Sequence, residues 1–127
     1  MKAELLNGAN LAFIGDAYYE LFIRRRLLEK EITNQNELQK LASGYVSAKA
    51  QHLVVSKLVD LSPEEIAIFK RGRNHKFRGF RKNLKKEEYL NSTGFEALIG
   101  YHYLKGNFQR LHELLDFAVA VIEGEHE

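Results

Sequence analysis

The sequence predicts an all-α domain, and three observations support this fold class. Only one of the 127 residues is proline, so little in the chain interrupts long helices. Apolar residues recur with the 3.6-residue period of amphipathic helices along most of the chain. No two segments form a convincing pair of strands. With 45% hydrophobic residues the chain can bury one core, so we expect a single domain over residues 1–127.

The first predicted helix covers about residues 11–30. Its expected apolar stripe faces away from the consecutive residues Arg24, Arg25 and Arg26, which lie on the opposite side. The stripe consists of Leu11, Ile14, Tyr18, Leu21, Phe22 and Leu28.

Capping residues indicate the later helices, which we place at about 36–42, 45–61, 63–71, 87–105 and 108–123. Asn34 lies in the cap region of the second helix, and Gly44 is its expected stop. Ser62 before Pro63 is typical of an N-cap followed by the first helical position. Gly106 separates the last two helices.

Composition excludes several classes of protein. The chain has no cysteine, which rules out disulfides and thiolate zinc sites and fits a reducing compartment. Its five histidines lack the paired spacing of a histidine metal site. We see neither a signal peptide nor an apolar run of about 20 residues, so we expect a cytoplasmic protein without a membrane partner.

Basic charge is concentrated in residues 70–86, KRGRNHKFRGFRKNLKK. This segment holds nine of the 19 lysines and arginines and no acidic residue, which leaves the rest of the chain net acidic. Lys and Arg side chains supply most of the non-specific affinity for nucleic acid. We predict that this segment, interpreted as a loop, binds RNA, although a solvated basic linker is the alternative. The RNA-binding candidates are Arg71, Arg73, Lys76, Arg78, Arg81, Lys82, Lys85 and Lys86.

Two carboxylates lie within apolar helical stretches. Asp16 occurs in LAFIGDAYYE (residues 11–20), and Glu96 occurs in STGFEALIGYHYL (residues 92–104). A buried carboxylate is normally paired, capping or metal-bound, because burying it alone costs several kcal/mol. Asp16 could instead be solvent-exposed or salt-bridged, and Glu96 could instead face solvent on an amphipathic helix. Glu20, one helical turn after Asp16, either supports the site from a second layer or pairs with Arg24.

The combination of the two carboxylates with the basic segment favours a metal site facing a polyanion. Mg²⁺ is typically held by one or two carboxylates, several waters and the phosphates of its substrate. We therefore take Asp16 and Glu96 as the candidate metal-binding and catalytic residues, with Mg²⁺ as the cofactor and Mn²⁺ able to replace it.

The segments LAFIGDAYYE and TGFEALIGYHYL resemble the two signature stretches of the ribonuclease III catalytic domain. Their spacing, the run from Tyr45 to Asn74 and the lack of a double-stranded-RNA-binding domain resemble the compact bacterial branch, the Mini-ribonucleases III. The resemblance covers essentially the whole chain. It assigns Asp16 and Glu96 to the family's metal ligands and Phe13 to its dimer interface. Two positions differ from the full-length enzymes, since Ala12 and Thr93 replace acidic residues, which implies a site with few ligands.

The resemblance implies a homodimeric, all-α bundle of the ribonuclease III endonuclease type that cleaves double-stranded RNA with Mg²⁺. The expected products carry a 5′-phosphate. The expected substrate is a ribosomal RNA precursor of the 23S type, with a ribosomal protein that presents the RNA as a further partner. A non-catalytic RNA-binding or ribosome-assembly module with the same fold is the alternative. A helical DNA-binding or protein-interaction domain is a third hypothesis.

Overall fold

The structure is a computed structural model that describes residues 1–74 and 83–124, with the side chains of Asn83 and Leu84 left out. Every regular element in these residues is helical, which confirms the predicted all-α class. The elements are a short 3-10 helix η1 (Ala3–Leu5) and the helices α1 (Gly8–Glu29), α2 (Gln35–Val46), α3 (Ala48–Lys57), α4 (Pro63–Arg73), α5 (Asn83–Lys105) and α6 (Phe108–Ile122).

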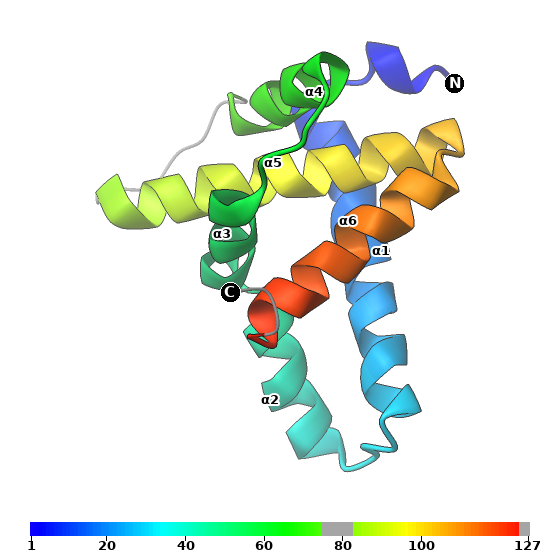
Figure 1. Cartoon of the computed structure of the whole chain (residues 1–127), viewed down its shortest axis with the longest axis vertical. Helices are drawn as coiled ribbons and strands as arrows, with labels where there is room; N and C mark the ends of the chain where they lie inside the picture. The colour runs from blue at the N-terminus through cyan, green and yellow to red at the C-terminus, as the bar shows by residue number, and fades with distance from the viewer. Residues whose placement is uncertain (75–82, 125–127) are drawn as a thin grey trace.

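The two longest helices, α1 and α5, form the centre of the fold. Figure 1 shows α5 running across the molecule and α1 crossing it, and this pair makes the most extensive contact between elements. The helices α3 and α4 pack against α5, α2 packs against α1, and α6 contacts both α3 and α5. Residues on α1 and α5 are therefore held by most of the other helices at once.

Two glycines allow α1 and α5 to approach until their backbones touch. A Cβ added to Gly15 would collide with the backbone carbonyl of Glu96, and one added to Gly100 would collide with the carbonyl oxygen of Leu11. No side chain can be accommodated at either position without separating the helices. The crossing point of α1 and α5 is consequently fixed next to Asp16 and Glu96.

The predicted apolar stripe of the first helix is only partly correct. Leu11 is buried, and Tyr18 and Phe22 are partly buried against the core, but the fully buried residues of the helix recur mainly at every fourth position along a neighbouring face. Leu21 and Leu28 remain 64% and 54% exposed, respectively. The helix carries apolar residues on more than one face, and the small residues Ala12 and Gly15 admit α5 to one of them. The face that packs consists of Leu11, Gly15, Tyr19, Ile23 and Leu27.

The N-cap residues in the sequence correctly predicted where two helices begin. The side chain of Asn34 accepts a hydrogen bond from the Glu37 amide at 2.9 Å. Ser62 forms a full capping box with Glu65, with distances of 3.1 and 3.0 Å for the two reciprocal bonds. Both starts lie within one residue of the prediction, because a cap depends on neighbouring residues alone.

The predicted stop at Gly44 is wrong. The helix α2 continues through Gly44 to Val46, so Tyr45 lies in the last turn of α2 rather than at the start of α3. The chain breaks at Ser47, whose backbone is extended and whose side chain accepts from the Ala50 amide at 3.2 Å. A hydroxyl that caps the next helix determines the boundary here, and the predicted helix over 45–61 shortens to Ala48–Lys57.

The remaining boundaries shorten the predicted basic loop from both ends. The helix α4 extends to Arg73, and α5 begins at Asn83 rather than at residue 87. Arg71, Arg73, Lys85 and Lys86 are therefore helical residues. None of the helices in the part of the chain that the structure describes has the length and hydropathy of a membrane-spanning segment.

Candidate active site

Asp16 and Glu96 line the same hollow, which we call the carboxylate hollow. It has a volume of about 340 Å³ and lies where α1 passes α5. Asp16 is exposed and Glu96 is half-buried. Residues far apart in the sequence thus converge, as the combination of the two motifs predicts. The lining residues are Ala9, Ala12, Phe13 and Asp16 from α1 and Tyr89, Ser92, Thr93 and Glu96 from α5.

The position of the two carboxylates follows from the glycine-mediated crossing. Asp16 directly follows Gly15, and the backbone of Glu96 packs on Gly15 itself. Each helix therefore presents its carboxylate beside the point of closest approach. The separation of the two acids depends on backbone contact rather than on flexible side chains.

Burial is the largest influence on Glu96 and raises its pKa to about 8. A hydrogen bond from Gln51 opposes this shift, whereas the charge of Asp16, a hydrogen bond with Asp16 and the charge of Glu20 add to it. Without a cation, Glu96 therefore holds its proton at neutral pH. A cation between the carboxylates would remove the repulsion and displace the proton.

No lysine or arginine among residues 1–74 and 83–124 forms an ion pair with Asp16 or Glu96. The same residues contain no group of three or more His, Asp or Glu side chains that could enclose a metal ion. Two carboxylates without a protein cation suit Mg²⁺, which keeps several waters and needs only one or two carboxylate ligands. The donor set fits a magnesium ion completed by substrate phosphate and not an all-protein metal cage.

The two positions that differ from the full-length family pattern both line the carboxylate hollow. Ala12 offers no ligand atom. The Thr93 hydroxyl donates to the Tyr89 carbonyl at 3.0 Å, as Ser92 does at 2.8 Å. Neutral side chains thus occupy places where the family pattern has acids, so the sparse acidic site expected from the sequence agrees with the geometry.

Glu20 pairs with Arg24, and it also acts on the hollow at a distance. The Arg24 guanidinium donates to Glu20 Oε2 at 3.1 Å through Nε and at 2.5 Å through its terminal nitrogen. The negative charge of Glu20 is nevertheless one of the causes that raise the pKa of Glu96. The pair with Arg24 is therefore present, whereas support of a metal by Glu20 stays a prediction.

Arg71 and Arg73, both candidates for RNA binding, already have partners within the fold. Arg71 donates to the backbone carbonyls of Glu4 and Leu6 at 2.9 and 3.1 Å. Arg73 pairs with Glu87 at 3.1 Å and donates to Asn91 at 2.6 Å. Segment 70–86 has no acid of its own, but the fold supplies one from the next helix. Arg73 is therefore paired in the fold although its own segment contains no acid.

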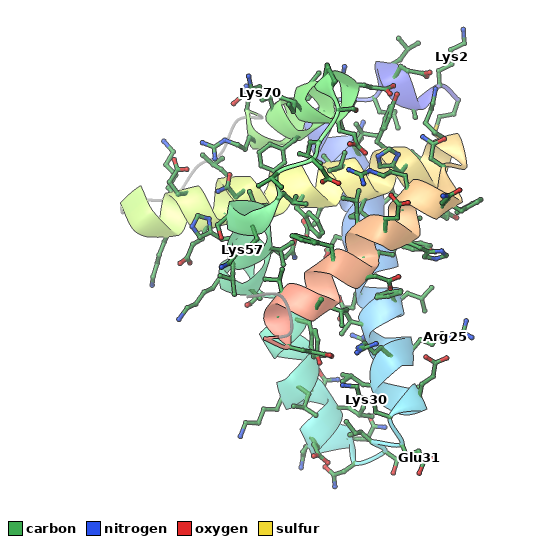
Figure 2. All side chains as sticks on the ribbon, in the orientation of Figure 1. Lys2, Arg25, Lys30, Glu31, Lys57 and Lys70 are labelled. Carbon is green, nitrogen blue, oxygen red and sulfur yellow. The ribbon has the colours of Figure 1, made fainter. Side chains whose placement is uncertain are left out.

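Lys85 and Lys86 are exposed on the first turns of α5, and Lys70 is exposed on α4. Figure 2 shows Lys70 on the opposite side of the molecule from Arg25 and Lys30, which lie at the far end of α1. Basic side chains are therefore spread over more than one surface. The other RNA-binding candidates, Lys76, Arg78, Arg81 and Lys82, lie outside the described residues.

Phe13 is 82% exposed although it is a large apolar side chain, and it lines the carboxylate hollow. The side chain is therefore accessible to a partner, and its role in a dimer interface stays a prediction. This position is consistent with the interface role that the family resemblance assigns to it.

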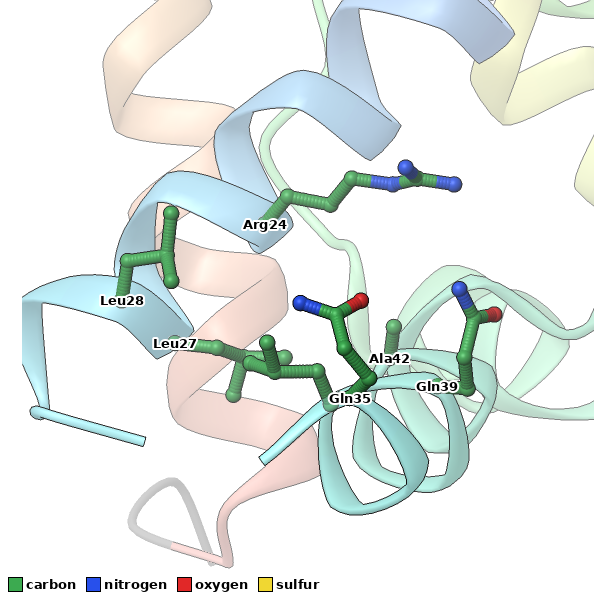
Figure 3. Close-up of a pocket in the computed structure, with 7 residues that line it drawn as sticks. Arg24, Leu27, Leu28, Gln35, Gln39 and Ala42 are labelled. Carbon is green, nitrogen blue, oxygen red and sulfur yellow. The ribbon is translucent and has the colours of Figure 1, made fainter. Parts of the chain in front are cut away.

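A different hollow lies between α1 and α2, and Figure 3 shows the side chains around it. Its volume is about 200 Å³, and it is lined by Arg24, Leu27, Leu28, Gln35, Leu38, Gln39 and Ala42. It contains no carboxylate, and the guanidinium of Arg24 is already paired with Glu20. The candidate catalytic groups therefore lie in the carboxylate hollow and not in this second hollow.

Sequence reasoning assigned no role to Gln51, although this residue contacts the site. Its side-chain amide donates to Glu96 Oε2 at 3.0 Å and to the Val46 carbonyl at 2.9 Å. The residue is fully buried on α3. An amide among the apolar residues of a helix is a weak signal by itself, since it can equally face solvent.

Comparison with known proteins gives a consistent result. Residues 9–107 match the Ribonuclease III domain. The chain is 45% identical over 122 residues to Mini-ribonuclease 3 of Brevibacillus brevis, which covers 95% of this chain and 91% of that protein. It is 42% identical to Mini-ribonuclease 3 of Streptococcus pneumoniae over 98% of this chain and 99% of that protein. A crystal structure of a Fusobacterium nucleatum protein superposes with a TM-score of 0.83 at 34% identity, covering 98% and 99% of the two chains.

The helical fold and these matches define a ribonuclease III domain. The chain belongs to the ribonuclease III family, among relatives that are Mini-ribonucleases 3, and its enzyme class is endoribonuclease. This confirms the resemblance seen in the two signature stretches.

Proposed function

We propose that the protein is a Mg²⁺-dependent endoribonuclease that cleaves double-stranded RNA at the carboxylate hollow. One observation carries the proposal: Asp16 and Glu96 meet at the α1–α5 crossing, and their mutual repulsion is not relieved by a protein cation among the described residues. A site of this kind gains most from binding a divalent cation together with a polyanionic substrate.

Asp16 and Glu96 would hold the Mg²⁺ ion, with Mn²⁺ able to replace it. Bound there, the ion would supply charge stabilisation at the scissile phosphate and a water activated for in-line attack. The residues of the chain fix the place of the reaction, since both carboxylates are anchored by the helix crossing. Glu96 would hold the ion in its deprotonated form, so its raised pKa would couple metal binding to pH. The expected products carry a 5′-phosphate and a 3′-hydroxyl.

Cleavage of a duplex RNA of defined length, with and without MgCl₂, tests this proposal. The parent protein should cleave with Mg²⁺ or Mn²⁺ and stop when EDTA is added, and Asp16→Asn and Glu96→Gln should be inactive while remaining folded. Undiminished cleavage by both variants would reject the site. RNA binding without turnover by the parent would favour a non-catalytic module instead.

The exposed lysines of α5 are the best described candidates for binding phosphate. Lys85 and Lys86 have no ion-pair partner among the described residues, whereas Arg73 is paired with Glu87. Removing one lysine that binds a phosphate should reduce the log–log salt slope of RNA binding by roughly 0.7–0.9. Lys85→Gln with Lys86→Gln should flatten the slope, and duplex DNA should compete poorly if the 2′-hydroxyl and A-form shape are read.

We also propose that the protein acts as a homodimer through the surface around Phe13 and processes a ribosomal RNA precursor of the 23S type. The exposed phenylalanine next to the hollow supports the dimer, since a second copy would cover it and bring two hollows onto one duplex. Sedimentation of the parent and of Phe13→Glu tests this: the variant should become monomeric. Cleavage of precursor RNA, with and without ribosomal proteins, tests the substrate.

A further inference from the structure

We infer that Gln51 is a positioning residue for the reaction: it holds Glu96 in the orientation that accepts the metal. This inference rests on the proposed role of Glu96. It goes beyond the two carboxylates, because Gln51 lies on a third helix and is not an acid.

The contacts of Gln51 connect Glu96 to the junction between α2 and α3. One nitrogen, Nε2, donates to Glu96 Oε2 at 3.0 Å and to the Val46 carbonyl at 2.9 Å. Val46 is the last residue of α2, so its carbonyl is one of those that a helix end leaves without an intrahelical partner. A single amide group thereby ties the carboxylate to a rigid backbone position.

The orientation of the amide is fixed by the chemistry of its partners. Both Val46 and Glu96 present oxygen acceptors, so the nitrogen and not the oxygen of the amide must face them. Gln51 Oε1 is then buried and has no hydrogen-bond partner within the described residues. A buried acceptor without a partner is destabilising, so the residue is poorly explained by stability alone.

The hydrogen bond acts on the charge of Glu96 as well as on its position. Gln51 is the one influence that favours the ionised form of Glu96 among those identified, and it opposes burial, Asp16 and Glu20. The hydrogen bond from Gln51 is made to Oε2 alone, so it does not occupy Oε1, and Glu96 itself lines the hollow. Ligand carboxylates in metal sites are commonly oriented by such partners.

The test compares Gln51→Met with the parent in full-length protein. Methionine has nearly the same length and removes the donor. We expect the Mg²⁺ concentration for half-maximal cleavage to rise about 10-fold or more, with the KM for duplex RNA unchanged within about twofold. Gln51→Glu keeps the length and polarity but places an acceptor against Glu96, so it should shift the Mg²⁺ requirement at least as far. It also serves as the test if the methionine variant does not fold.

Ser47→Ala is the matched control, because Ser47 caps α3 at the same junction without touching Glu96. If the role of Gln51 is purely structural, the Gln51 variants and Ser47→Ala should all lower Tm, and none should change the Mg²⁺ concentration for half-maximal cleavage. If Gln51 positions Glu96, this Mg²⁺ concentration should change in the Gln51 variants alone.

Two results would overturn the inference: a parent-like Mg²⁺ midpoint in both Gln51 variants, or an equal shift in Ser47→Ala. If Glu96→Gln is also inactive in the first case, only the role of Gln51 is rejected. Full activity of Glu96→Gln would reject the proposed site, and the inference with it.

Discussion

Two carboxylate clusters lie on α5 and its neighbours, and the fold compensates their negative charge in opposite ways. Glu65 accepts hydrogen bonds from Arg110 at 2.7 and 3.0 Å and contacts His102 Nε2 at 2.7 Å. Burial alone would raise the pKa of Glu65, but these bonds and the Ser62 backbone amide lower it to about 2. At the carboxylate hollow, burial and like charge raise the pKa of Glu96 to about 8.

The protein uses charge to stabilise its fold at Glu65 but not at the carboxylate hollow. The Glu65 cluster joins the start of α4 to the end of α5 and the start of α6, and the protein itself supplies the compensating cation. The carboxylate hollow lacks such a cation in the described chain. It is an electrostatically unfavourable arrangement that a bound ligand would relieve, as expected of a functional site.

The largest predicted effect separates activity from stability. Asp16→Asn or Glu96→Gln should reduce cleavage by about 10³-fold, corresponding to roughly 4 kcal/mol of lost transition-state stabilisation. The unfolding free energy of the metal-free protein at neutral pH should change little, because Glu96 is already protonated there and an amide at either position can still form a hydrogen bond. Single-turnover rates and urea denaturation measure the two quantities. A variant that loses stability in step with activity would contradict the comparison.

A substitution in the Glu65 cluster should have the opposite effect: it should reduce stability and leave cleavage unchanged. Arg110→Met should lower the unfolding free energy by about 3 kcal/mol, since it leaves a buried carboxylate with too little compensation. The cleavage rate per folded molecule should be unchanged, because Arg110 is not a lining residue of the hollow. Arg110→Lys, which keeps the positive charge, is the control, and its unfolding free energy should fall by less. Thermal melts and activity at a temperature where both variants are folded provide the test.

The pH dependence of stability should also have opposite signs at the two sites. The folded-state pKa of Glu96 is about 8, above its ordinary value of 4.5, so the native state binds the extra proton between these values. The unfolding free energy of the metal-free protein should therefore fall as pH rises from about 5 to 8, and Glu96→Gln should remove this slope.

Glu65 has a pKa of about 2, below its ordinary value of 4.5. Its contribution to the unfolding free energy is therefore complete above pH 4.5 and is lost as the pH falls from 4.5 to about 2. Denaturation of the parent and of Glu96→Gln in EDTA at several pH values measures the difference between them. A parent whose stability rises toward pH 8 while the variant's stays level would show that Glu96 is not protonated in the native state.

The smallest predicted effect concerns Glu20. Its ion pair with Arg24 lies at the surface, so Glu20→Gln should change the unfolding free energy by less than about 0.5 kcal/mol. Its charge raises the pKa of Glu96, so the variant should move the midpoint of the pH–activity profile to lower pH. Arg24→Gln should move the midpoint the other way. Unchanged midpoints in both would restrict Glu20 to the surface pair.

Local signals in the sequence predicted the parts of the fold that depend on near neighbours. The cap at Asn34 and the capping box at Ser62 were located because a side chain and the next backbone amides decide them. The all-α class was predicted from periodicity, and the convergence of Asp16 with Glu96 from two motifs. The Arg73–Glu87 pair and the Gln51 hydrogen bond join different helices, so neither is visible before the helices are placed.

The errors have the same physical origin. The helix α1 offers apolar residues on several faces, and the packing of α5 onto the small ones selects the face that is buried. Gly44 can stop a helix, but its backbone does not adopt the positive φ of a glycine stop, unlike that of Gly106. The boundary lies instead at Ser47, where a cap is made. Tertiary contacts thus override local preference at both places.

The close approach of Gly15 and Glu96 limits how this protein can vary. An added methyl group at residue 15 or 100 would separate the two helix axes and, with them, the anchor points of both acids. Loss of function and loss of packing would then arise from one substitution that touches no catalytic group. In a saturation library, positions 15 and 100 should therefore tolerate as few replacements as Asp16 and Glu96, although glycine contributes nothing to the chemistry.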